Sequence, residues 1–368
     1  MNTSLLEYLK CVDCNHEHLQ LHAIESNERQ QVITGYLQCE HCQACFPIIH
    51  GVLIAFRQDR LQDLLLPEER EVLSRHSVPL PSGKSSSSDG LTQGQAQTHR
   101  NWSFQWLKMD TETYEHDWGK GFEDLEKFHY YDIPIPPEEY EGKIICEASC
   151  GFGRVIKILH DKPSRYIAFD LSGAVYKAMK LFPQSEKLDV IRANIHHPPF
   201  KEAVFDILFS PRALHHTGNM DVALQRLIPL VKKGGLFAYS VYSRENNTLM
   251  WGVIEPMKRL FNRYIPRPVM LVLSNILAVF VMAIIHLLYV PLDTLHVKIL
   301  PLHNFFMVWS TFSFTTIKMN VFDLLHAPYA EYISGEQISR WETQYHLAPL
   351  HKKLLHDTVW GYAARKEQ

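Results

Sequence analysis

The sequence lacks an excess of charge of either sign. It has 37 Lys and Arg residues against 40 Asp and Glu residues, which leaves a formal net charge of −3 over 368 residues. Domains that bind nucleic acid usually carry clustered positive charge, so the composition argues against a nucleic-acid partner. The first residues, MNTSLLEYLKCVDC, also lack a basic stretch followed by an apolar run. We therefore expect no secretory signal and a cytoplasmic location.

Cysteine is scarce beyond the first fifty residues, where five of the seven cysteines lie. Four of the five form two CxxC pairs, Cys11 with Cys14 and Cys39 with Cys42. In a chain without a secretory signal, such pairs favour metal thiolates over disulfides. Two pairs suit one tetrahedral Zn²⁺, which would supply much of the folding energy of so short a unit. A redox CxxC explains only one pair, and Cys45 is either an alternate ligand or a buried thiol.

The second cysteine pair belongs to a longer pattern. Cys39 and Cys42 are followed by an aromatic-Pro-Ile step at 46–48, by Gly51, and by an apolar strand that closes the unit. This pattern resembles the small zinc-binding domain related to the activator subunit of tRNA and protein methyltransferases. The resemblance implies a zinc-binding domain over residues 1–57.

A polar stretch separates this unit from the rest of the chain. Residues 57–79 are charged and helical in pattern, and PSGKSSSSDGLTQGQAQTHR (81–100) is polar and without apolar periodicity. Residues 58–100 are therefore predicted to be a helical segment and flexible linker. From residue 101 the composition changes to aromatic, and rings such as Trp102, Trp106 and Trp118 either cap a core or form the walls of a substrate pocket.

The stretch ICEASCGFGRV (144–154) predicts a strand, a tight turn and a helix. A second predicted strand ends at Asp170, as in an α/β doubly wound fold with ligands at the carboxyl ends of its strands. A dinucleotide site would have a third glycine where Ile156 stands, so this cofactor class is disfavoured. Glu147 would repel a pyrophosphate but attract the ammonium and sulfonium groups of S-adenosylmethionine.

Residues 140–242 resemble the class I, seven-stranded S-adenosylmethionine-dependent methyltransferases. The acid-small-Gly-Cys-Gly-x-Gly motif of that family matches residues 147–153, with Ser149 in place of the first glycine. Three later stretches also match the family. They are the acid at the end of the second strand (Asp170), the pair that lies beside the adenine of the cofactor in the family (Asn194-Ile195), and the fourth strand (205–210). The resemblance implies a Rossmann-like sheet and a cofactor-binding set of Glu147, Ser149, Gly151, Gly153, Asp170, Leu171, Asn194, Ile195 and Ser210.

The loop after the strand 205–210 carries the candidate catalytic residues. RALHHTGN matches the Leu-His-His-Thr signature of methyltransferases related to the quinone-biosynthesis C-methyltransferases. His216, with His215 beside it, is a candidate general base, and Arg212 a candidate holder of an anionic substrate. The alternative is a structural role, in which these histidines pack in the core or form hydrogen bonds with the backbone. Because Ser210-Pro211-Arg212 replaces the Asn/Asp-Pro-Pro-aromatic loop of amino-group methyltransferases, oxygen or carbon acceptors are favoured over nitrogen.

An apolar segment without charged residues spans 269–290, inside a predicted helical insertion at about 244–330. By length it could cross a membrane. However, a crossing would separate the last hairpin (about 354–366) from its own sheet. The segment is therefore expected to be a core or dimer helix, or a lid that lies on or dips into a membrane surface, and true spanning or re-entrant insertion is a third, less favoured alternative. In the second case, residues 256–290 would make peripheral contact, with Lys258, Arg259, Arg263 and Arg267 facing anionic headgroups.

Further along, NVFDLLHAPYAEYISGEQ resembles a stretch of related methyltransferases. The resemblance implies that Asp323 and Tyr329 border the acceptor pocket, and the alternative is that Pro328-Tyr329 pins the insertion to the core. The sequence thus predicts methyl transfer to an oxygen or carbon of a small, hydrophobic or lipid-like molecule. Modification of tRNA or protein is one alternative, and a non-catalytic zinc- and cofactor-binding adaptor is another. The sequence does not indicate an oligomeric state.

Overall fold

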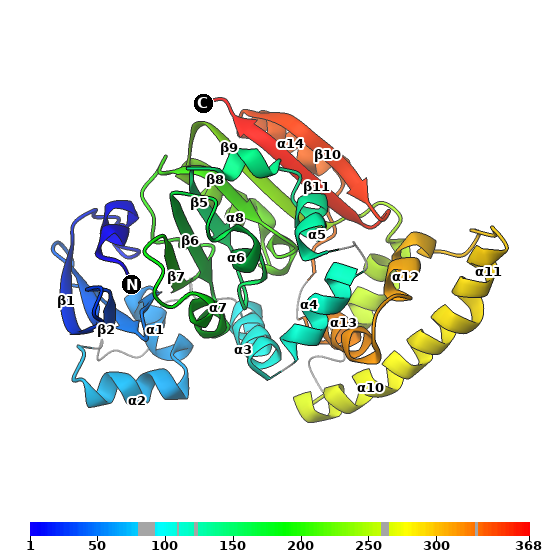
Figure 1. Cartoon of the computed structure of the whole chain (residues 1–368), viewed down its shortest axis with the longest axis horizontal. Coiled ribbons are helices and arrows are strands. Elements are labelled where there is room, and N and C mark those ends of the chain that lie inside the picture. The colour runs from blue at the N-terminus through cyan, green and yellow to red at the C-terminus, as the bar shows by residue number, and fades with distance from the viewer. Residues whose placement is uncertain (80–92, 109, 121–123, 259–264, 328–329) are drawn as a thin grey trace.

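The computed structural model describes residues 1–79, 93–108, 110–120, 124–258, 265–327 and 330–368. Their strands form one sheet in the order β1-β2-β3-β4-β7-β6-β5-β8-β9-β11-β10, with helices on both of its faces (Figure 1). The strands are β1 Leu19–Ser26, β2 Val32–Cys39, β3 Cys45–Ile49, β4 Val52–Ala55, β5 Ile144–Ala148, β6 Arg165–Asp170, β7 Leu188–Ala193, β8 Phe205–Ser210, β9 Val231–Tyr242, β10 Leu347–Leu355 and β11 Val359–Lys366.

Seven of these strands, from β7 to β10 in the sheet order, make the predicted Rossmann-like unit. Strands β5 to β9 pair in parallel, and β11 pairs antiparallel with both β9 and β10. Strand β7 (LDVIRA) is buried along its whole length, as expected for a parallel strand covered on both faces. The predicted α/β fold class is confirmed, and the last hairpin lies in the same sheet as predicted.

The N-terminal strands continue this sheet, which the sequence did not predict. Strand β4 pairs in parallel with β7, so that Leu53 lies opposite Ile191 and Ala55 opposite Ala193. Hydrogen bonds also connect the N-terminus to the far unit, since the Asn2 backbone N–H donates to Asp189 Oδ1 at 2.8 Å. The N-terminal unit is therefore joined to the larger one by backbone pairing.

A buried ion pair lies beside this junction. Arg192 on β7 donates through Nη1 to Glu69 of helix α2 (Pro67–Arg75), and both side chains are almost fully buried. The second oxygen of Glu69 accepts from the Tyr176 hydroxyl at 2.6 Å, and Arg192 Nη2 donates to the Leu64 carbonyl at 2.6 Å. Each charged group is thus both paired and hydrogen-bonded, which burial of charge requires.

The remaining helices follow the strand connections. The short 3-10 helices are η1 Thr3–Tyr8, η2 Pro137–Tyr140, η3 Leu214–His216 and η4 Ile228–Leu230. The α-helices outside the insertion are α1 Gln58–Leu64, α2, α3 Gln93–Lys108, α4 Thr111–Lys120, α5 Leu125–Asp132, α6 Arg154–Leu159, α7 Val175–Leu181, α8 Met220–Leu227 and α14 Gly335–Gln344.

One predicted boundary needs correction. Residues 93–100 were assigned to the flexible linker but form the first half of α3, while residues 80–92 of that linker lie outside the described residues. The Gln and Ala residues of this stretch are good helix formers. The second half of α3 is anchored by buried Asn101, Ser103 and Gln105. Tertiary contacts thus hold a helix where the sequence lacks apolar periodicity.

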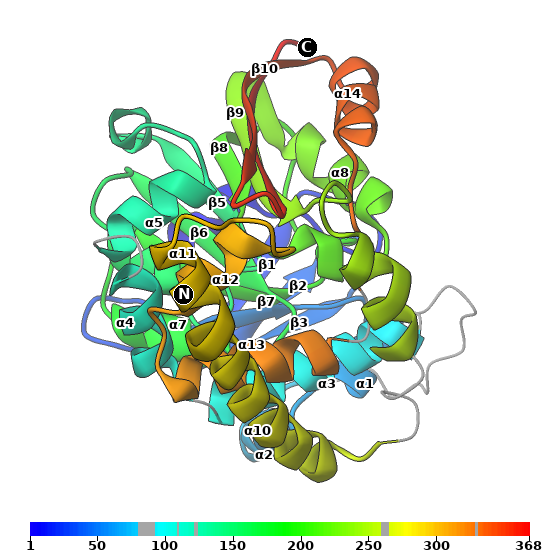
Figure 2. The ribbon, with the colours of Figure 1, turned by 90° about the vertical axis from the view of Figure 1, so that its right-hand side faces the viewer.

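The insertion between β9 and α14 contains the apolar segment. Its elements are η5 Met250–Ile254, α10 Arg267–Ile284, η6 Ile285–Tyr289, α11 Val290–Thr294, α12 His303–Trp309 and α13 Phe314–His326. Residues Pro268–Thr294 form one continuous helical run of 27 residues, long and apolar enough to cross a membrane, and only 22% of its most apolar window is buried. Figures 1 and 2 show this run on the outside of the molecule.

The structure corrects two expectations about this segment. The helical run is not a core helix of the described chain, because Phe280 and Leu287 are 61% and 79% exposed. One face alone, through Ala278 and Ile285, packs into a cluster with α4, α12 and α13. In addition, Lys258 does not face a headgroup layer, since it is buried and pairs with Glu255 at 2.5 Å. Arg259 and Arg263 lie outside the described residues, as does the side chain of Arg267.

We predict that Glu69→Gln lowers the free energy of unfolding by about 3–5 kcal/mol, because it leaves the Arg192 charge buried without its counter-charge. Urea denaturation followed by circular dichroism measures this change. Glu71→Gln is the matched control on the same helix, where the pair with Arg75 is about two-thirds exposed, and it should leave the stability nearly unchanged. Equal stability losses in the two variants would contradict the role of the buried pair.

Candidate functional site

A cavity of about 250 Å³ lies at the carboxyl edge of the parallel strands. One wall comes from the loops that follow β5, β6, β7 and β8, and the opposite wall from α3, α4, α12 and α13. Figures 1 and 2 show these helices gathered at one end of the sheet. The insertion therefore helps to enclose the place where a doubly wound fold binds its ligands.

The turn after β5 forms the floor of one half of the cavity. The backbone N–H groups of Ser149 and Cys150 both donate to the Phe169 carbonyl, at 2.7 and 3.1 Å, which fixes the turn against β6. Ser149, Gly151 and Gly153 all have left-handed backbone, with φ of 65°, 54° and 90°. Ser149 thus adopts a conformation that costs a residue with a Cβ roughly 1–2 kcal/mol. The serine occupies the glycine position of the motif at a cost in strain.

Gly153 is required for close packing as well as for its left-handed backbone conformation. A Cβ at this position would lie 2.9 Å from Leu181 Cδ1 and 3.0 Å from the Ala178 backbone. Gly153 therefore allows α6 to begin directly against α7, and it does not line the cavity itself.

Two carboxyl groups face the cavity from this side. Glu147 at the end of β5 is buried and accepts a hydrogen bond from the Tyr166 hydroxyl at 2.6 Å. Burial raises the pKa of Glu147 to about 8, although the Tyr166 hydrogen bond opposes the shift. Asp170 at the end of β6 accepts from the backbone N–H groups of Gly151 and Ser172, at 2.9 and 2.7 Å. Burial also raises the pKa of Asp170.

Most of the predicted cofactor residues meet at this cavity. Seven of the nine line it: Glu147, Ser149, Gly151, Asp170, Leu171, Asn194 and Ile195. The other two, Gly153 and Ser210, lie behind the lining, with Ser210 fully buried within β8. Two acids on one wall and the rings of Trp106 and Phe152, whose centroids are 4.9 Å apart, suit a cationic ligand with an apolar portion. These residues fit S-adenosylmethionine.

Of the three candidate catalytic residues, two line the cavity. His216 faces it, with its ring 5.3 Å from the ring of Trp102. His215 does not line the cavity, because its fully buried ring packs at a tilt against Tyr242, with the ring centroids 3.9 Å apart. In this arrangement His215 therefore does not contact an acceptor. Burial also lowers the pKa of His215 well below its usual value.

Arg212 lines the cavity but is held by the protein. Its Nε donates to Asp132 Oδ1 at 2.7 Å, and its guanidinium lies 5.2 Å from the ring centre of Trp118. Burial opposes the charge of Arg212, but the attraction of Asp132 outweighs it and raises the pKa. Its Nη2 atom is buried without a hydrogen-bond partner among the described residues, so one donor is left for a ligand.

The opposite wall holds residues that sequence reasoning did not assign to a site. Tyr114 of α4, Phe305 and Trp309 of α12, and Asn320 of α13 all line the cavity. Asp323, which a resemblance placed at the acceptor pocket, lines it as well, and Tyr329 lies outside the described residues. The available signal was the sequence FTTIKMNVFDLLH, in which Asn320 and Asp323 are polar residues between apolar neighbours, three positions apart and thus on one face of the helix.

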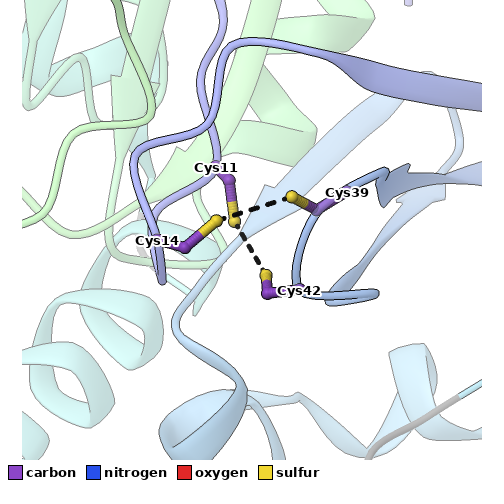
Figure 3. Close-up of side chains that lie close together, drawn as sticks. All are labelled: Cys11, Cys14, Cys39 and Cys42. Atoms are coloured by element: carbon purple, nitrogen blue, oxygen red, sulfur yellow. Dashed lines mark hydrogen bonds between the residues drawn. The ribbon is translucent and has the colours of Figure 1, made fainter.

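A second site lies in the N-terminal unit. The Sγ atoms of Cys11, Cys14, Cys39 and Cys42 all lie within 4.8 Å of one another (Figure 3). The Cys11–Cys42 and Cys14–Cys39 sulfur distances are both 3.6 Å. A tetrahedral Zn²⁺ with bonds of about 2.3 Å requires sulfurs about 3.8 Å apart, so the four thiols fit this ion. Cys45 lies outside the group, and its Sγ faces the Gln43 carbonyl at 3.6 Å.

The family model described as "Methyltransferase domain" matches residues 146–239. This match begins within β5, ends within β9 and includes every predicted cofactor residue. Residues 146–239 are therefore similar to a methyltransferase domain. The cavity beside Glu147 and Asp170, whose residues fit S-adenosylmethionine, agrees with this similarity.

Similar proteins are known for part of the chain. The phthiotriol/phenolphthiotriol dimycocerosates methyltransferase of Mycobacterium tuberculosis is 27% identical over 141 residues, which are 36% of this chain and 52% of that protein. The tRNA U34 carboxymethyltransferase of Sulfurovum is 28% identical over 108 residues, which are 28% of this chain and 36% of that protein. The chain thus spans about half the length or less of these two relatives.

Among solved structures, an S-adenosylmethionine-dependent methyltransferase from Mesorhizobium loti is 22% identical. The aligned region covers 32% of this chain and 53% of the Mesorhizobium loti chain, with a TM-score of 0.29.

Proposed function

We propose that the protein transfers a methyl group from S-adenosylmethionine to an oxygen or carbon of a hydrophobic, lipid-like molecule. One observation carries the proposal: a single cavity joins the Glu147–Gly153 turn to the inner wall of an insertion whose outer face is apolar. The relative from Mycobacterium tuberculosis, whose name denotes a lipid methyltransferase, supports this acceptor class.

The walls of the cavity suit the reaction. Methyl transfer from a sulfonium is an in-line displacement, which an enzyme accelerates chiefly by aligning the two reactants and excluding water. Rings from α3, α4 and α12, including Trp102, Trp118 and Trp309, surround the space beside the cofactor turn. Large rigid rings exclude water and give an apolar acceptor a defined position.

We expect the affinity for S-adenosylmethionine to rise with pH. Below the Glu147 pKa of about 8 the carboxyl is neutral, and binding the ammonium group of the cofactor requires loss of that proton. Affinity should therefore increase by about tenfold per pH unit below this pKa and level off above it. Isothermal titration calorimetry with S-adenosylmethionine measures the profile.

Glu147→Gln should bind more weakly and remove this pH dependence. The control Glu139→Gln, at an exposed pair with Arg365, should keep the wild-type profile. Wild-type affinity in the Glu147 variant would contradict the assigned role.

We further propose that the helical run Pro268–Thr294 lies in the surface of a bilayer, which would make the protein peripheral to a membrane. Its outer side exposes Val272, Val279, Phe280 and Leu287. A contiguous row of exposed apolar side chains such as this one indicates a partner surface. A bilayer is the occupant that fits, because the run has a mean hydropathy of 2.6 over its most apolar window. A membrane would also supply the lipid-like acceptor next to the cavity walls of α12 and α13.

We predict that the full chain floats with phosphatidylglycerol vesicles in a density gradient. The double variant Phe280→Asn/Leu287→Asn should remain at the bottom, since two of the most exposed apolar side chains of the run are lost. Leu350→Asn is the matched control, because Leu350 is 58% exposed but lies on β10, away from the insertion. It should float like the wild type. A wild-type chain that does not float would exclude the membrane contact.

We propose that the four cysteine thiolates bind one structural Zn²⁺. Mass spectrometry of metals in the purified chain should find a single zinc per chain, and Cys42→Ser should lose both the zinc and much of the stability of the N-terminal unit. Cys45→Ser is the control, because its sulfur lies outside the four-sulfur group, and it should keep the metal. Zinc retained after loss of Cys42 would contradict this ligand set.

A tRNA or protein acceptor is the second candidate. The Sulfurovum relative, whose name denotes a tRNA-modifying enzyme, favours it. The formal net charge of −3 and the apolar outer face of the insertion favour the lipid-like acceptor instead.

A further inference from the structure

The acceptor half of the cavity contains polar atoms without partners. Arg212 Nη2, Trp309 Nε1, Asn320 Nδ2 and Asp323 Oδ1 all belong to cavity-lining residues, and each is buried without a hydrogen-bond partner within the described chain. An unsatisfied buried polar group costs about 1–3 kcal/mol, so such a set around one cavity indicates a ligand that pairs with it.

Asp323 differs from the other residues of this set because its oxygen accepts a hydrogen bond, whereas their nitrogens donate one. The nitrogens of Arg212, Trp309 and Asn320 suit oxygen atoms of a ligand, whereas the carboxylate oxygen requires a hydrogen donor. A hydroxyl group is the donor that the substrate of an oxygen-methylating site would present. The arrangement therefore favours a hydroxyl acceptor over a carbon acceptor that carries no acidic proton.

The helix that carries Asp323 is firmly positioned. At its start, the Ser313 backbone N–H donates to Asp117 of α4 at 2.8 Å, and the Thr316 hydroxyl donates to the same carboxylate at 2.5 Å. Phe322, next to Asp323, is fully buried. Asn320 and Asp323 lie three residues apart and thus project from one face of α13 into the cavity.

The groups around Asp323 leave its carboxyl able to exchange a proton near neutral pH. Burial raises the pKa of Asp323 to about 7, while the positive charge of Lys258 and a hydrogen bond from Gln105 lower it. Lys258 itself pairs with Glu255. Two tyrosines face Asp323 as neutral phenols, because burial raises the pKa of Tyr114 to about 12 and that of Tyr242 well above its usual value.

We propose that Asp323 is the general base of the reaction and that the acceptor is therefore a hydroxyl group. Asp323 Oδ1 takes the hydroxyl proton while the acceptor oxygen forms a bond to the methyl carbon. The bond between that carbon and sulfur breaks, and its electron pair stays on sulfur. The donors of Asn320 and Trp309 hold other oxygens of the acceptor. This inference rests on the proposed methyl transfer and narrows its acceptor from oxygen or carbon to a hydroxyl oxygen.

His216 remains the base that the sequence predicts, and the two assignments differ in a measurable way. The His216 ring packs against the rings of Trp102 and His215, with centroids 5.3 and 4.1 Å away. If Asp323 is the base, a His216 variant still shows the ionisation of Asp323 in its pH profile, whatever rate it retains.

The test measures transfer of labelled methyl groups from saturating S-adenosylmethionine to a total lipid extract at limiting lipid concentration. Because the cofactor is saturating at every pH, the effect of Glu147 ionisation on cofactor affinity does not alter the measured rate. The wild-type rate should fall by about tenfold per pH unit below pH 7, since only the ionised carboxylate accepts a proton. Asp323→Asn should lose about 10²–10⁴-fold in rate and show no break near this pH. His216→Gln should keep the break.

Two controls separate loss of chemistry from loss of structure. Calorimetry should show that Asp323→Asn binds S-adenosylmethionine as the wild type does, and Asp323→Glu should recover part of the rate together with the pH break. Asp63→Asn, at the largely exposed carboxylate of α1 that pairs with Arg60 and lies outside the cavity lining, should leave the rate unchanged.

Each remaining outcome decides against a proposal. If the wild type transfers methyl groups and Asp323→Asn matches it, or if His216→Gln alone abolishes the break, the role of Asp323 is wrong while the methyltransferase function stands. If the wild type transfers no label to lipid, the proposed function fails and this inference fails with it.

Discussion

The parallel pairing of β4 with β7 is the contact on which the arrangement of the whole chain depends. It joins the four N-terminal strands to the seven-stranded unit, so that one sheet runs through both. The buried pair of Arg192 and Glu69 lies at the same junction and links α2 to β7. Because a buried charge is tolerated only with its partner in place, this pair holds α2 against β7.

The parallel pairing among β5, β6, β7 and β8 determines where the chemistry lies. The carboxyl ends of β5, β6, β7 and β8 meet at one edge, which brings Glu147, Asp170, Asn194 and the loop of Arg212 around one space. The strained turn at Ser149 allows the backbone to pass close to that space. Helices α3 and α4 and the insertion then close it from the other side.

The insertion has two faces with opposite requirements. Its inner wall presents the polar side chains of Asn320 and Asp323 to the cavity, and its outer run exposes Phe280 and Leu287. Neither face is fully satisfied by the described chain, because the inner one has unpaired polar atoms and the outer one has uncovered apolar surface. A lipid-like hydroxyl acceptor at a bilayer surface would satisfy both faces at once.

Local features of this protein were determined by the sequence itself. The strand at 205–210, the helix beginning at Arg154 and the two cysteine pairs follow from short spacings, because backbone geometry over a few residues depends on those residues alone. The charge of Glu147 and the absence of a glycine at 156 likewise sufficed to choose between two cofactor classes.

Only the tertiary structure decided which distant residues meet. The pairing of β4 with β7, the helix at 93–100, the burial of Lys258 against Glu255 and the exclusion of His215 from the cavity all depend on contacts with other elements. The role that we infer for Asp323 depends on α13 packing against α4, far away in the chain. Periodicity shows that a helix has an apolar face, but the surface which covers that face is fixed only when the chain folds.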